Sequence, residues 1–141
     1  MGDDENITEM LSDAGYSDKA IEYFMKKENI GSLDNPDQVT DLTGPCGDKM
    51  RISLKFDDGI INNAKIQVIG CPGAVVAGCV LVNLAKGKPI VEAKKIDVQD
   101  LYKEVEKLPD QKIHCAKLAI QTLRKALKEY ESQKRTRKDG D

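Results

Sequence analysis

Hydrophobic and polar residues alternate most regularly in two runs of the chain, residues 49–56 and 64–68. In the first run one face carries Met50, Ile52, Leu54 and Phe56, and the other carries Lys49, Arg51, Ser53 and Lys55. In the second run, Ala64, Ile66 and Val68 alternate with Lys65 and Gln67. Between them, Asp57-Asp58-Gly59 predicts a turn. This pattern predicts a β-hairpin with one buried face, in which Met50 lies opposite Ile66 or Val68.

Most of the other apolar residues recur with the helical period of three to four residues. This spacing predicts helices over residues 19–27, 74–86, 89–95, 97–108 and 113–131, and a short helix around Ile7–Leu11. Asp97 is placed to cap the helix that it precedes. Residues 29–41 have few apolar side chains and contain Asn35-Pro36-Asp37, so a loop is expected there.

Length and composition indicate one soluble globular domain. The chain has 141 residues, 40% hydrophobic and 33% charged, which is enough to bury a core without disulfide bonds. The net charge of −2 argues against general nucleic-acid binding, and no apolar run approaches the roughly 18 residues of a membrane span. The acidic N-terminus is typical neither of a secretory signal nor of a transit peptide. We therefore expect a cytoplasmic protein whose four cysteines are reduced.

Three of these cysteines stand at the ends of patterned segments, beside glycines or a histidine: Cys46, Cys71 and Cys115. Extending the hairpin ladder brings Cys71 close to Cys46 and Asp48. Cys71 and Cys115 also fall at predicted helix N-termini, where the helix dipole favours a thiolate. Cys79 lies on an apolar helix and is interpreted as a packed core thiol.

Three thiolates with a carboxylate or an imidazole suit either zinc or an iron–sulfur cluster. A hard carboxylate such as Asp48 matches an iron–sulfur core less well than a fourth thiolate would, so it favours a cluster that is released readily. His114 adjoins Cys115, but successive helical residues point about 100° apart. It is therefore either an auxiliary ligand or a hydrogen-bonding neighbour.

Three motifs in this order resemble the IscU/NifU N-terminal family of iron–sulfur cluster assembly scaffolds. They are Thr43-Gly44-Pro45-Cys46-Gly47-Asp48, Gly70-Cys71, and Leu108-Pro109 followed by Lys112, His114 and Cys115. The resemblance implies an α+β fold, with a small antiparallel sheet built on the hairpin, packed against several helices, and the metal site at one tip. It divides the chain into an acidic N-terminal extension (residues 1–15), a scaffold domain (16–131) and a charged C-terminal tail (132–141).

The resemblance also implies a role for each site residue. Cys46, Cys71 and Cys115 would be cluster ligands, with Asp48 tuning cluster lability and His114 as an auxiliary ligand. Cys115 matches the position that accepts sulfur as a persulfide, and Lys112 matches a lysine that offsets thiolate charge. The expected cofactor is an iron–sulfur cluster of the [2Fe–2S] type, with zinc in the cluster-free form.

The expected partners are a cysteine desulfurase, a donor of iron and electrons, and acceptor apo-proteins, with no nucleic acid and no membrane. The family's chaperone-recognised Leu-Pro-Pro-Val-Lys is replaced here by Leu108-Pro109-Asp110-Gln111-Lys112, which argues against a DnaK-type chaperone.

These observations predict a scaffold that is not an enzyme. It would receive sulfur, bind iron and pass a labile cluster to acceptors. The alternative is a zinc-bound sulfur acceptor that stimulates a cysteine desulfurase without carrying a cluster. A Cys–His hydrolase is disfavoured because His114 and Cys115 are adjacent in sequence and no third orienting group is evident.

Overall fold

The predicted hairpin is present in the computed structural model, which describes residues 2–26, 28–45, 47–106, 109 and 112–140. Strand β2 (Lys49–Asp57) pairs antiparallel with β3 (Ile60–Ile69), and Met50 lies opposite Val68 as expected. The chain reverses at Asp58-Gly59, where φ angles of 53° and 78° give the turn that matches the twist of the strands. The apolar face of the hairpin is fully buried at Met50, Ile52, Leu54, Ala64 and Ile66.

A third strand, β1 (Gln38–Thr43), pairs antiparallel with β2 and gives a sheet of order β1-β2-β3. This strand corrects the loop predicted over residues 29–41. Alternation does not mark it, because polar Gln38 and Thr40 take the positions that face the core. Both side chains are buried and donate hydrogen bonds to the Glu129 carboxylate, which satisfies the Gln38 amide nitrogen and the Thr40 hydroxyl, whereas the buried Gln38 Oε1 has no partner among the described residues.

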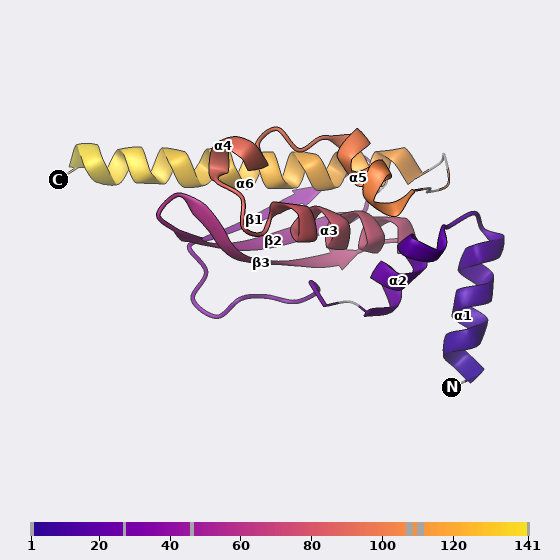
Figure 1. The fold of residues 1–141 in the computed structure, drawn as a ribbon. Helices are drawn as coiled ribbons and strands as arrows, with labels where there is room; N and C mark the ends of the chain where they lie inside the picture. The colour runs from indigo at the N-terminus through magenta and orange to yellow at the C-terminus, as the bar shows by residue number, and fades with distance from the viewer. Residues whose placement is uncertain (1, 27, 46, 107–108, 110–111, 141) are drawn as a thin grey trace.

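The structure has six described helices. They are α1 (Gly2–Asp13), α2 (Asp18–Lys26), α3 (Pro72–Ala85), α4 (Ile90–Ala93), α5 (Val98–Val105) and α6 (Ile113–Gly140). Helices α3 and α6 lie against this sheet, and α1 stands at one end of the molecule beside α2, as Figure 1 shows. Helix α3 packs on β3, α6 packs on β1 and β2, and these two helices contact each other. The architecture is α+β, as predicted from the resemblance. No helix within the described ranges is both long and apolar enough to cross a bilayer.

Two helices are longer than their apolar patterns predicted. Helix α6 continues past Glu131 to Gly140, since no proline or glycine interrupts that stretch. Helix α1 likewise spans Gly2–Asp13, although Leu11 is its one buried residue among those whose side chains are described. Hydrophobic periodicity marks only the part of a helix that packs on the core, so it misses these ends.

The N-cap of α5 gives the first testable prediction. The Asp97 carboxylate accepts hydrogen bonds from the Gln99 and Asp100 N–H groups, and the Asp100 side chain accepts one from the Asp97 N–H. We expect Asp97→Ala to lower the free energy of unfolding by about 1 kcal/mol, because first-turn N–H groups lose their acceptor. Urea denaturation measures this change. Asp57→Ala, at the exposed end of β2, serves as a control and is expected to shift stability less.

Candidate metal centre

Cys71 lies at the junction between β3 and α3. The strand ends at Ile69, and Cys71 occupies the N-cap position of α3 with an extended backbone (φ −75°, ψ 169°). Pro72 follows at the start of the helix, where a residue without an N–H costs nothing. The half-buried thiol of Cys71 therefore lies at a helix N-terminus, as the sequence predicted.

Cys115 lies in the first turn of α6, and its side chain is fully buried. Its Sγ is 3.6 Å from Cys71 Sγ, 3.5 Å from His114 Nε2 and 3.8 Å from Asp48 Oδ2. One ligand atom each from Asp48, His114 and Cys115 lies within 4.8 Å of the other two. We call these four residues, Asp48, Cys71, His114 and Cys115, the cysteine site.

Asp48 enters the cysteine site from the turn that precedes β2. Gly47 in this turn has a φ of +88°, which glycine adopts without strain, and the Gly44 N–H donates to the Asp48 carbonyl at 2.7 Å. Gly70 leaves room for the carboxylate, since a Cβ at that position would lie 2.8 Å from Asp48 Oδ1. The position of the carboxylate therefore depends on the absence of a side chain at residue 70.

The two thiols differ in their tendency to ionise. Burial raises the pKa of Cys115 to about 12, and the neighbouring Cys71 and Asp48 add to the increase. Burial alone would also raise the pKa of Cys71, but the nearby Ala74 N–H, the Cys115 thiol and Lys112 together lower it below its ordinary value. Cys71 therefore holds the more readily formed thiolate of the pair.

Tyr16 is a residue of this region that sequence reasoning missed. Its side chain is buried, and a Cβ at Gly73, two residues after Cys71, would lie 3.1 Å from its hydroxyl oxygen. Burial raises the pKa of Tyr16 to about 12, to which Cys71 and Cys115 contribute, while the Gly73 N–H lowers it. The sequence offered one indication of this contact, which is the position of Tyr16 just before a predicted helix. A tyrosine that is buried there needs a polar partner for its hydroxyl group.

Lys112 lies where the resemblance placed it, beside the thiols. The same hypothetical Cβ at Gly73 would lie 2.9 Å from Lys112 Cγ, and the ammonium group favours ionisation of both Cys71 and Cys115. Of the other predicted residues, Cys46 lies outside the described residues, as do Leu108, Asp110 and Gln111 of the chaperone-type segment.

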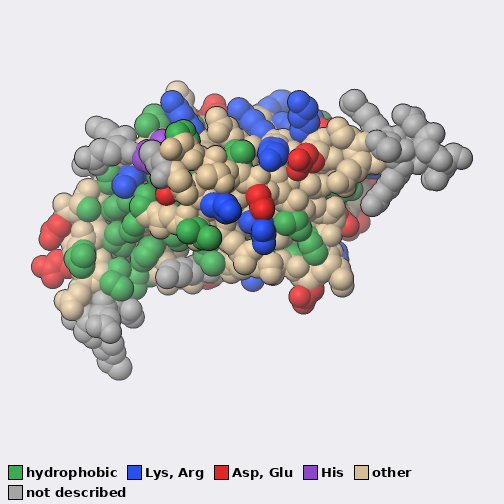
Figure 2. Space-filling view, turned by 180° about the vertical axis from the view of Figure 1, so that it is seen from behind, with side chains coloured by type: hydrophobic (Ala, Val, Ile, Leu, Met, Phe, Trp, Pro, Cys, Tyr) green, Lys and Arg blue, Asp and Glu red, His purple; other side chains and the backbone are tan. Residues whose placement is uncertain are grey.

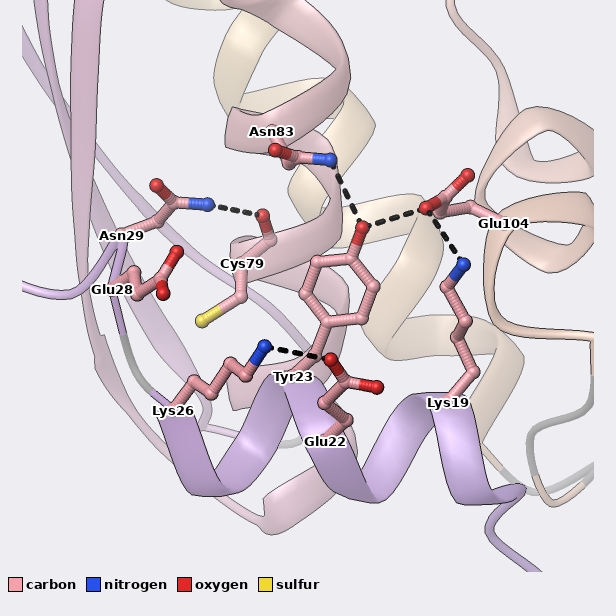
Figure 3. Close-up of a pocket in the computed structure, with 9 residues that line it drawn as sticks. All are labelled: Lys19, Glu22, Tyr23, Lys26, Glu28, Asn29, Cys79, Asn83 and Glu104. Carbon is pink, nitrogen blue, oxygen red and sulfur yellow. Dashed lines mark hydrogen bonds and ion pairs between the residues drawn. The ribbon is translucent and has the colours of Figure 1, made fainter.

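Cys79 does not belong to the cysteine site. It is buried about two turns along α3 from Cys71, in agreement with the predicted buried thiol. Figure 3 shows it at the wall of a separate cavity of about 200 Å³, where its carbonyl accepts a hydrogen bond from Asn29. Across this cavity the Tyr23 hydroxyl bonds with Glu104 and Asn83, which connects α2 to α5 and α3.

The cysteine site offers two sulfur donors, one carboxylate and one imidazole from three separate segments. Soft thiolates select zinc, copper(I) or iron–sulfur clusters, and the carboxylate adds a hard oxygen donor. The chemistry of this donor set fits a soft or borderline metal and argues against calcium or magnesium, which prefer all-oxygen shells.

Comparison with known proteins gives the same family at the level of sequence and of fold. Residues 15–137 match the model of the NifU-like N terminal domain. The chain is 38% identical over 116 residues to iron-sulfur cluster assembly scaffold protein IscU 1 of Archaeoglobus fulgidus, covering 82% of this chain and 76% of that protein. It is 36% identical over 124 residues to the IscU scaffold protein of Escherichia coli K12, covering 84% of this chain and 96% of the relative.

Among solved structures, the NifU-like N-terminal protein of Brucella abortus superimposes with a TM-score of 0.70 at 20% sequence identity. That comparison covers 86% of this chain and 98% of the other chain, and it supports the fold alone. The match to the family model and the identity to IscU proteins over most of their length establish the family as well as the fold. The chain belongs to the family of NifU-like N-terminal domains that includes the IscU proteins.

Proposed function

We propose that this protein is a scaffold on which an iron–sulfur cluster is assembled and from which it is transferred to acceptor proteins. The observation that carries the proposal is the meeting of Cys71, Cys115, Asp48 and His114 at one place, in a chain whose relatives are named iron-sulfur cluster assembly scaffold proteins. A scaffold of this kind does not turn over a substrate as an enzyme does.

Each residue of the site would have its own role in binding the cluster. Cys71 and Cys115 supply thiolates, Cys46 supplies the third, and Asp48 supplies an oxygen donor that keeps the cluster labile. His114 is an auxiliary ligand, and Lys112 offsets the negative charge of the thiolates. Iron binding must displace the proton of Cys115, whose pKa of about 12 keeps it protonated at neutral pH in the metal-free protein.

Sulfur delivery requires a change at Cys115. We propose this residue as the persulfide acceptor, yet its thiol is fully buried and less readily ionised than that of Cys71. A cysteine desulfurase must therefore meet a form of the scaffold in which the first turn of α6 is open. The further partners proposed are an iron and electron donor and acceptor apo-proteins.

This difference between the thiols gives a second prediction. In the metal-free protein, iodoacetamide is expected to alkylate Cys71 at least about tenfold faster than Cys115, because the thiolate is the reactive form. Peptide mass spectrometry over a time course at pH 8 measures both rates. Under mild urea the two rates should converge as Cys115 becomes exposed. Equal rates in the native protein would contradict the burial of Cys115.

Anaerobic reconstitution tests the scaffold proposal. With ferrous iron, L-cysteine, a cysteine desulfurase and a thiol reductant, the metal-free protein is expected to develop the visible charge-transfer absorption of a [2Fe–2S] cluster. On mixing with an apo-ferredoxin, that absorption should move to the ferredoxin.

A second candidate function uses the same donors. Zinc accepts a tetrahedral shell of thiolates, imidazole and carboxylate, so the cysteine site also suits a zinc-bound sulfur acceptor that stimulates a desulfurase. A colourless protein that keeps one zinc ion through the reconstitution and still accelerates the desulfurase would support this alternative and overturn the scaffold proposal.

A further inference from the structure

Strand β1 is an edge strand whose outer side is paired with no other strand of the described ranges. The Gly44 N–H donates to Asp48 in register, so the even-numbered residues of β1 form its hydrogen bonds to β2. The N–H and C=O groups of Val39, Asp41 and Thr43 consequently point away from the sheet. At Asp41 the outward C=O accepts a hydrogen bond from Lys125 Nζ at 3.0 Å, which agrees with this assignment.

A shallow groove of about 600 Å³ runs between this edge and the C-terminal half of α6. We call it the β1 groove, and it is lined by Gln38, Val39, Lys125, Lys128, Glu129, Ser132 and Gln133. Val39 contributes an apolar side chain that is 45% exposed, although valine is usually covered in a sheet. The outward backbone groups and the uncovered side chain of Val39 thus lie in this groove, and the outward groups of Asp41 and Thr43 continue along the same strand edge, as in sheets that accept an added strand.

The rim of the β1 groove is positively charged. No acidic residue occurs between Ile113 and Lys128, and lysine and arginine side chains gather along the top of Figure 2, on the α6 side of the molecule. Lys125 and Lys128 are exposed, and no carboxylate of the described residues forms an ion pair with either. The one acidic residue of the lining, Glu129, is directed at Thr40 and Gln38 of β1.

We propose that the β1 groove binds an extended acidic segment of a partner protein, which adds to the sheet as a fourth strand beside β1. Side chains alternate across a strand, so acidic residues on one face of the segment would meet Lys125 and Lys128, and apolar residues on the other would cover Val39. A carboxylate is a stronger acceptor than a peptide carbonyl, so it would draw Lys125 from Asp41 and free that C=O for pairing.

Charge argues against a second copy of the chain as the occupant, and the side chains of the lining argue against a nucleic acid. A second copy pairing through β1 would bring the lysine-rich rims of two α6 helices together, which costs repulsion. A nucleic acid would find no aromatic side chain in the lining on which a base could stack.

A strand added beside β1 would extend toward the cysteine site, because Thr43 at the end of β1 pairs with Lys49, which follows Asp48. This inference goes beyond the scaffold proposal, because strand addition needs no metal.

The test uses a fluorescein-labelled peptide that alternates glutamate and valine, titrated with the full chain and followed by fluorescence anisotropy at low salt. We expect binding that weakens as salt is raised, and amide NMR shifts concentrated at Val39, Asp41 and Thr43. Lys125→Glu/Lys128→Glu is expected to weaken binding at least about tenfold. The matched control Lys95→Glu/Lys103→Glu reverses two exposed lysines outside the β1 groove and should leave the affinity unchanged.

Backbone pairing is tested separately from charge. Val39→Pro removes an outward N–H without removing a bond to β2, and circular dichroism verifies its fold. In a second test, the peptide is N-methylated on the amides that would pair with β1, which removes the N–H donors of the ligand. We expect both changes to abolish binding. Unchanged affinity in either case would overturn the proposal.

Three further outcomes would also overturn it. The first is equal binding of a peptide that alternates lysine and valine. The second is a single-stranded oligonucleotide that binds more tightly and depends on Lys125 and Lys128. The third is sedimentation showing a dimer that Val39→Pro dissociates, since the occupant would then be a second copy of the chain.

Discussion

The Cys115→Ser variant is expected to form no visible cluster in anaerobic reconstitution and to accept no sulfur from a cysteine desulfurase. Cys115 Sγ lies within 4 Å of a donor atom of Cys71, His114 and Asp48, so its loss removes the one atom that contacts each of the other three residues of the cysteine site. A serine hydroxyl is a harder and far less acidic donor, which does not replace a thiolate toward iron. Visible absorbance, bound iron and persulfide mass are the measurements.

Cys79→Ala is the matched control for that variant. It also removes a buried thiol, but from a cavity wall outside the cysteine site. The control should form the cluster at the unsubstituted level, even if its thermal stability falls. A Cys115→Ser protein that still carried a full cluster would show that Cys115 is not a ligand.

The Asp48→Ala variant is expected to carry a longer-lived cluster that moves to apo-ferredoxin roughly tenfold more slowly, equivalent to about 1.4 kcal/mol in activation free energy. The carboxylate is the one hard donor of the cysteine site, so its removal eliminates the weakest match to an iron–sulfur core. Stopped-flow transfer measured by circular dichroism gives the rate.

Gly70→Ala provides a companion to Asp48→Ala. Its Cβ would lie 2.8 Å from Asp48 Oδ1, so the carboxylate must move while its charge is kept. We expect this variant to slow transfer as well, but by less. Transfer that is unchanged in both variants, or a less stable cluster in Asp48→Ala, would contradict the proposed role of the carboxylate.

Sequence patterns predicted those parts of the fold in which apolar burial repeats along the chain. The hairpin register followed from matching apolar faces, and the cap of α5 from the position of Asp97. Strand β1 escaped prediction because its core-facing positions carry Gln38 and Thr40, whose burial depends on Glu129, distant in sequence. A hydrogen-bond partner that is distant in sequence produces no periodic pattern within the strand itself.

Part of the cysteine site was also predictable from the pattern of apolar residues along the chain. Strand register placed Asp48 near Cys71, the helical pattern placed Cys115 and the adjacent His114 at a helix N-terminus, and the resemblance supplied Lys112 and the role of each residue. The contact of Tyr16 with this region could not be inferred, because it depends on how the start of α2 packs against the start of α3. The difference in acidity between Cys71 and Cys115 likewise arises from tertiary burial, which sequence spacing does not encode.

The cysteine site draws its donors from the start of β2, the β3–α3 junction and the start of α6, which only the folded chain holds together. Metal occupancy and global unfolding are therefore thermodynamically linked. A ligand at a hundred times its dissociation constant stabilises the native state by about 2.7 kcal/mol. Any substitution that loosens the docking of α6 on the sheet should, by the same linkage, weaken metal retention even far from the sulfur atoms.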